Sequence, residues 1–159
     1  MYCYEVDRSN RKDARENPKQ RMPMRALLTL MAVLESTVGL ALLASPALPV
    51  SILLGAPLET PVGLSVGRIA WTALVALGIT CWRARNDGRG RCATSVIASM
   101  LFYNVLVVLV IIYAQLVLGV KGIGLRPAMF LHLVLALWCV TSVLGPVNPT
   151  TSETPARRP

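Results

Sequence analysis

The chain has 159 residues, of which 54% are hydrophobic and 15% are charged. A soluble domain carries about 25% charged residues, so this composition excludes an ordinary soluble protein and favours one that lies in a membrane. The net charge of +8 would be compatible with binding to a nucleic acid. However, most basic residues flank apolar runs, and no aromatic residues are interleaved with them. We therefore expect a lipid bilayer as the partner, and no nucleic acid.

A polar tail and an apolar run begin the chain. Residues 1–23 are polar and of mixed charge, which predicts a disordered tail on the cytoplasmic side. The apolar run over 25–43 predicts the first membrane span, and Pro46 ends it. A cleaved signal peptide is the alternative for this run, but Glu35 lies inside it and its length exceeds the usual apolar region of about 7–15 residues. Translation could start at any of three methionines: Met1, Met22 or Met24.

Three further apolar runs follow a short segment. The segment SILLGAPLET, at 51–60, is too short to cross a bilayer and predicts an interfacial helix or loop on the outer side. Residues 147–159 are rich in Pro, Ser and Thr and predict a second disordered cytoplasmic tail. The remaining predicted spans cover residues 62–82, 93–118 and 127–144.

These runs predict an all-α fold, namely a four-helix transmembrane bundle over residues 24–146 with a short extracytoplasmic interfacial segment between helices 1 and 2. Strands of a membrane barrel would alternate polar and apolar residues over about ten positions, whereas the run VLVVLVIIYAQLVL does not alternate and is longer. Helices also satisfy their own backbone hydrogen bonds in lipid.

Basic residues predict the orientation. Eleven of the 16 Lys and Arg residues lie in the N-terminal tail, at the start of the first span, or in the 83–91 loop, and none lies in the loop over 44–62. Because basic loops stay in the cytoplasm, we expect a multi-pass protein of the plasma (inner) membrane with both termini cytoplasmic.

Each predicted span carries one strongly polar residue near its middle. Counting about 1.5 Å per residue from the cytoplasmic ends places two of them about 16 Å deep and two about 20 Å deep. A charge at the bilayer centre costs about 2.5–3.5 kcal/mol on insertion scales, so we expect the acidic and basic members to pair inside the bundle. The four residues of this predicted polar layer are Glu35, Arg68, Asn104 and His132.

Small residues predict which helix faces point inward, because small faces let helices approach closely. On the second span this face holds Ser65, Arg68 and Thr72. On the fourth span the corresponding face holds Ala128, His132, Ala136 and Cys139.

The polar layer has two interpretations. It is either structural, holding four helices in register, or a site for a small polar ligand, a lipid headgroup or a proton. Arg68 alone could instead extend to the outer surface. Haem would need a second ligand besides His132, and Tyr103 points to a different side of its helix from Asn104, which argues against a proton relay. We therefore predict no catalytic residue, no cofactor and no metal site.

A family resemblance rests on four short motifs. They are a glutamate in the first span, Gly67-Arg68-Ile69-Ala70 in the second, Tyr103-Asn104 in the third and a histidine in the fourth. In these the chain resembles a group of small bacterial four-helix membrane proteins of uncharacterised activity, broadly similar to the DoxX-like proteins. The resemblance covers residues 24–146 and implies a four-helix bundle in a bacterial plasma membrane. It implies no particular reaction, although the wider group is linked to quinone or sulfur redox chemistry.

Two functions remain open at this stage. The first is a small non-enzymatic membrane protein, either a binding module or an accessory subunit of a membrane complex, with other membrane subunits or further copies of itself as partners. The second is a quinone-binding component of a membrane oxidoreductase. A transporter is disfavoured because the four spans show no inverted repeat or pair of broken helices.

Overall fold

The computed structural model describes residues 18–87 and 90–144, which form five helices and no strand. Four of these helices are long and apolar enough to cross a membrane, in agreement with the predicted all-α fold. The fifth is short and occupies the place of the predicted interfacial segment. In chain order the helices are α3 (Pro18–Ala44), α4 (Ala47–Leu54), α5 (Pro61–Ala84), α6 (Arg91–Leu116) and α7 (Leu125–Leu144).

The first helix begins earlier than predicted. Helix α3 starts at Pro18, inside the segment assigned to the N-terminal tail, and Pro23 lies within it. Residues 1–17 and the second predicted tail, 147–159, lie outside the described residues.

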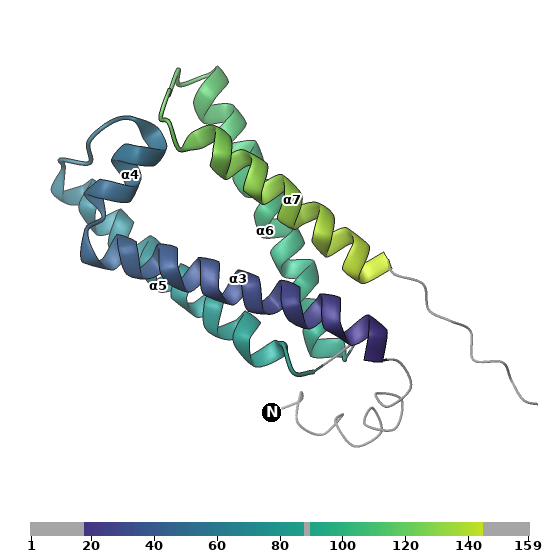
Figure 1. The fold of residues 1–159 in the computed structure, drawn as a ribbon. Helices are drawn as coiled ribbons and strands as arrows, with labels where there is room; N and C mark the ends of the chain where they lie inside the picture. Colours follow the sequence, from purple (N-terminus) through teal and green to yellow (C-terminus); the bar gives the residue numbers. More distant parts are fainter. Residues whose placement is uncertain (1–17, 88–89, 145–159) are drawn as a thin grey trace, which may run out of the picture.

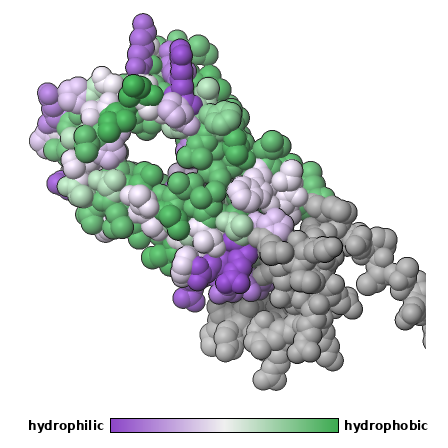
Figure 2. Space-filling view, in the orientation of Figure 1, coloured by the Kyte–Doolittle hydropathy of each residue, from purple (hydrophilic) through white to green (hydrophobic). Residues whose placement is uncertain are grey.

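The four long helices form two antiparallel pairs. Helix α3 packs mainly along α5, and α6 packs along α7, whereas contacts between the two pairs are few. The pairs approach each other at the end where α3 begins and α7 ends, and they diverge towards α4 (Figure 1). The space-filling view shows a gap through the molecule at the divergent end, bounded by α3, by α4 and by the α6–α7 pair (Figure 2).

The hydrophobic core occupies the convergent end. Met24, Leu28 and Met31 follow a helical period along one face of α3 and are each no more than 3% exposed. They meet buried side chains from the other three long helices: Cys81, Ala84, Ala93, Ile97, Met100, Leu135 and Cys139. Outward-facing positions stay apolar, as Phe102 and Phe130 illustrate at 67% and 69% exposure. An exposed apolar surface of this kind fits a lipid environment.

A close approach of α3 and α5 depends on a glycine. A Cβ atom at Gly78 would collide with Ser36 Oγ and would lie 3.1 Å from the carbonyl oxygen of Ala32. The absence of a side chain therefore lets the two backbones pack closely, as small residues do between membrane helices.

At the divergent end the two pairs are connected by backbone. The N–H of Gly124, just before α7, donates to the carbonyl oxygen of Ile52 in α4 at 3.0 Å. A Cβ atom at Gly122 would collide with the carbonyl group of Leu53. Gly55 ends α4 with a φ of 72°, a conformation that glycine adopts readily. Helix α4 and the turn before α7 therefore close the gap at this end.

Candidate polar site between the helix pairs

Four side chains on three helices meet where the two pairs diverge. Tyr103 Oη of α6 donates a hydrogen bond to Glu35 Oε2 of α3 at 3.3 Å. On the other side of α6, Asn104 Oδ1 lies 2.7 Å from His132 Nδ1 of α7. The rings of Tyr103 and His132 contact each other edge to face, with centroids 5.9 Å apart. We call Glu35, Tyr103, Asn104 and His132 the polar site.

The polar site lies at a single depth. Glu35, Tyr103 and His132 are each twelve residues from the convergent end of their span, which is about 18 Å at 1.5 Å per residue. The residues at those ends are Pro23, Arg91 and Leu144, respectively.

Each helix places its polar residue one turn beyond the hydrophobic core. On α3, Glu35 continues the buried face of Leu28 and Met31. On α6, Asn104 follows Met100, and its Nδ2 donates to the Met100 carbonyl oxygen at 2.7 Å. Glu35 is 6% exposed and Asn104 is fully buried. The polar site therefore lies at the edge of the packed core, on the side towards the divergent end.

Asn104 fixes the orientation of the histidine. Because its Nδ2 donates to a carbonyl oxygen, its Oδ1 must be the atom that faces His132. An amide oxygen only accepts hydrogen bonds, so His132 Nδ1 carries the proton and donates it. In a neutral imidazole the other nitrogen, Nε2, then holds a lone pair.

Arg68 does not join this site. Its side chain is exposed, and within the described residues it forms no ion pair with Glu35, contrary to the expected pairing. Two features of α5 explain this. Arg68 lies sixteen residues from Ala84, about 24 Å from the convergent end, and so about 6 Å beyond the other three. It is also on the outer side of the helix, because the buried face holds Gly78, which packs against α3, and Gly67, which lies against Pro46.

The predicted inward faces have different outcomes. On α5, Ser65 and Thr72 are exposed beside Arg68, so that face was assigned to the wrong side. On α7 the prediction is confirmed, because Ala136 and Cys139 are buried and His132 is partly buried.

Sequence reasoning missed Tyr103. Adjacent helical residues point about 100° apart, which predicts that Tyr103 lies away from the other polar residues. In the structure the same angle lets α6 reach in two directions, with Tyr103 towards α3 and Asn104 towards α7. The available signal was that a tyrosine in the middle of an apolar span needs a partner for its hydroxyl.

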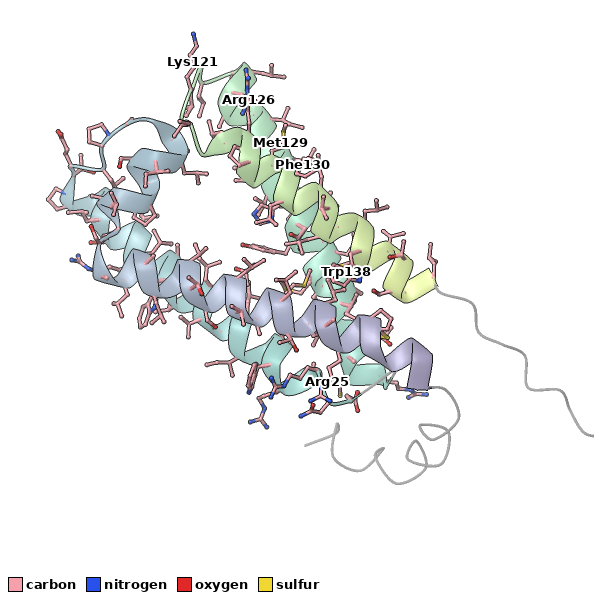
Figure 3. The ribbon with its side chains drawn as sticks, viewed as in Figure 1. Arg25, Lys121, Arg126, Met129, Phe130 and Trp138 are labelled. Atoms are coloured by element: carbon pink, nitrogen blue, oxygen red, sulfur yellow. The ribbon has the colours of Figure 1, made fainter. Side chains whose placement is uncertain are left out.

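Charged residues gather at the ends of the helices, away from the polar site. Arg25 lies at the convergent end, whereas Lys121 and Arg126 lie at the end with α4 (Figure 3). In the part of the chain that the structure describes, no group of three His, Cys, Asp or Glu residues could hold a metal ion.

No family model, curated protein or solved structure matches the chain. Fold and site together define the class: an all-helical protein with four candidate membrane spans and a buried polar site where two helix pairs diverge.

Proposed function

We propose that the protein is a small integral membrane binding module, which holds an amphipathic molecule against the polar site with its apolar part in the gap. The observation that carries this proposal is the position of Glu35. Its carboxyl group is almost fully buried, it lies one turn beyond the packed core, and among the described residues it receives one hydrogen bond, from Tyr103. Intramembrane ionisable residues of this kind are candidates for function.

A purely structural role accounts less well for the same residues. Hydrogen bonds between membrane helices contribute about 0.6 kcal/mol on average, whereas a charge in the bilayer costs about 2.5–3.5 kcal/mol. The Asn104–His132 bond joins α6 to α7, which already pack along each other. Among the described residues, one long hydrogen bond, from Tyr103 to Glu35, joins the two pairs at this depth. The free energy of this one hydrogen bond is too small to offset the cost of burying a carboxylate in the membrane.

We further propose the plasma (inner) membrane as the location, with both termini cytoplasmic, on the basis of the basic loops. The resemblance to DoxX-like proteins supports the same location. The quinone-binding alternative would use the same polar site, and the two functions differ in the hydrogen-bonding groups of the ligand.

Thermal unfolding of the purified protein in mild detergent tests the binding function. The probes are 4-phenylbutylamine, 4-phenylbutanol and decylubiquinone, each of which joins an apolar body to one kind of polar group. A saturable rise in Tm with at least one probe, lost in Glu35→Gln, supports the proposal. The control variant is Glu59→Gln, because Glu59 is exposed near the start of α5. If no probe shifts the Tm, the binding function is wrong.

A further inference from the structure

We propose that the ligand of the polar site carries a protonated amine on an apolar body. This inference rests on the proposed binding function and specifies its ligand. It follows from the hydrogen-bonding capacity that Glu35, Tyr103 and His132 have left, and from the charge of Glu35.

The histidine offers a lone pair. Its Nδ1 proton is directed at Asn104, so in the neutral ring Nε2 only accepts. Within the described residues no hydrogen bond reaches Nε2, and the atom is not sealed inside the protein. A ligand that contacts Nε2 must therefore donate a hydrogen.

Tyr103 and Glu35 offer the same kind of group. The single hydroxyl proton of Tyr103 is directed at Glu35 Oε2, which leaves Tyr103 Oη with lone pairs only. Glu35 Oε1 has no partner among the described residues and is not sealed off either. In the ionised carboxylate this oxygen only accepts hydrogen bonds, and a bound cation would favour the ionised form. All three helices of the site thus present acceptors.

Charge decides among the possible donors. Arg68 faces away from the polar site, and the other described basic residues lie near the helix ends, so none of them compensates Glu35. An ammonium group has three donors and a positive charge, and its hydrogen bonds to a carboxylate are stronger than those between neutral groups. The Tyr103 ring adds a face that attracts cations. A hydroxyl would leave the charge uncompensated, and a quinone has only acceptors.

The gap suits the rest of such a ligand. Its walls along α3 and along the α6–α7 pair are mostly hydrophobic (Figure 2). The polar site lies one turn beyond the core, on the side towards the divergent end where the gap opens. An amine placed against Glu35 would leave its apolar body between the two helix pairs.

Isothermal titration of the full chain in lipid nanodiscs at pH 7 tests the inference. The ligands are 4-phenylbutylamine, which is protonated at this pH as a lysine side chain is, and 4-phenylbutanol, which has the same shape without the charge. We expect the amine to bind about tenfold or more tightly than the alcohol, because its hydrogen bonds are charge-assisted. Decylubiquinone should not displace the amine.

Two variants locate the effect. Glu35→Gln keeps the shape of the side chain and removes its charge, so the preference for the amine should disappear. Glu35→Asp keeps the charge and should retain the preference, at weaker affinity because of its shorter reach. The exposed Glu59→Gln variant should bind as the unmodified protein does.

The outcomes separate this inference from the binding function. Saturable binding of decylubiquinone without binding of the amine overturns the inference and supports the quinone alternative. An amine affinity that is unchanged in Glu35→Gln also overturns it. If none of the three ligands binds, the binding function itself is wrong.

Discussion

Asn104 illustrates how one residue can organise several others. Its amide uses both ends, with Nδ2 on the backbone of its own helix and Oδ1 on His132 of α7. The bond inside α6 fixes the amide, and the fixed amide sets the proton of the imidazole. Because Asn104 is fully buried, no water can replace either of these two hydrogen-bond partners.

Removing this amide should therefore be costly. We expect Asn104→Leu to lower the free energy of unfolding by about 1–3 kcal/mol, since it leaves the Nδ1 donor of His132 without a partner. In a double-mutant cycle with His132→Leu, the coupling should reach about 0.6–1.7 kcal/mol, the range found between membrane helices. The measurement is unfolding in detergent. Ser99→Ala is the control, because among the described residues Ser99 Oγ donates to the Ser95 carbonyl oxygen of its own helix and to no other helix. Additive effects would contradict the interhelical bond.

Arg68 gives the opposite expectation. It is exposed and remote from the polar site, so Arg68→Leu should not destabilise the helix pairs. Combined with Glu35→Leu, its effect should be additive within about 0.5 kcal/mol, as for independent sites. The same unfolding assay on the two single variants and the double variant measures this. A coupling above about 1 kcal/mol would restore the Glu35–Arg68 pair that sequence reasoning expected.

The difference between Arg68 and the other three polar residues shows what the sequence could predict. Counting along the helices placed all four residues in one layer, which agrees with the structure for Glu35, Asn104 and His132, whereas α5 extends to Ala84 and leaves Arg68 about 6 Å beyond them. Rotation about the helix axis does not follow from counting. On α5 the buried face holds Gly67 and Gly78, whose lack of a side chain matters only once Pro46 and helix α3, respectively, are packed against them. No feature of the α5 sequence alone distinguishes that face from the face of Arg68.

At the level of elements, the α3–α5 pair depends on a close contact at Gly78. Gly78→Ala should destabilise the protein by about 1–3 kcal/mol, because the new methyl group meets Ser36 Oγ and the Ala32 carbonyl. Ser36→Ala in the same chain should recover part of the loss by removing the nearest atom. Thermal unfolding of the three variants measures the effect. A neutral Gly78→Ala would mean that the two helices are not in close contact there.

Helix ends were predictable where a residue has a local effect. Pro61 stands in the first turn of α5, and Thr60 Oγ1 accepts from the N–H of Gly63 at 3.0 Å, a standard N-cap. Asp87, in the loop before α6, accepts with Oδ2 from the N–H of Ala93 in the first turn of that helix. The start of α3 differs from the prediction. The segment 18–23 is polar and contains two prolines, and a sequence of this kind predicts a loop.

For the molecule as a whole, the apolar runs sufficed to predict four helices, but not their division into two diverging pairs. Divergence depends on α4, whose eight residues are too short to identify by periodicity. It also depends on a contact between residues far apart in the sequence, Ile52 and Gly124. The gap beside the polar site was therefore outside the reach of sequence reasoning.

The orientation in the membrane can be measured directly. We expect a periplasmic reporter fused after Arg158 to be inactive, because eleven basic residues in the first 25 residues and in the 83–91 loop would hold that end in the cytoplasm. A reporter inserted in the turn over 119–124 should be active, since that turn lies at the opposite end of α6. The reverse pattern would place the basic loops outside the cell and overturn the orientation.

The contact between α4 and the turn before α7 should control the width of the gap. Gly122→Ala places a methyl group against the Leu53 carbonyl and 2.7 Å from the Gly55 nitrogen, both backbone atoms that cannot rotate away. We expect α4 to move off α7, so that the distance between spin labels at two exposed positions, Leu48 and Arg126, increases and broadens.

Gly119→Ala is the matched control for this change. Gly119 lies in the same turn with a φ of 66°, so an alanine there is also strained, by about 1 kcal/mol. However, its Cβ atom would meet nothing within 4 Å. Both variants should therefore lose some stability, but only Gly122→Ala should change the spin-label distance. Equal spin-label distances in the two variants would show that the contact between α4 and the turn before α7 does not set the width of the gap.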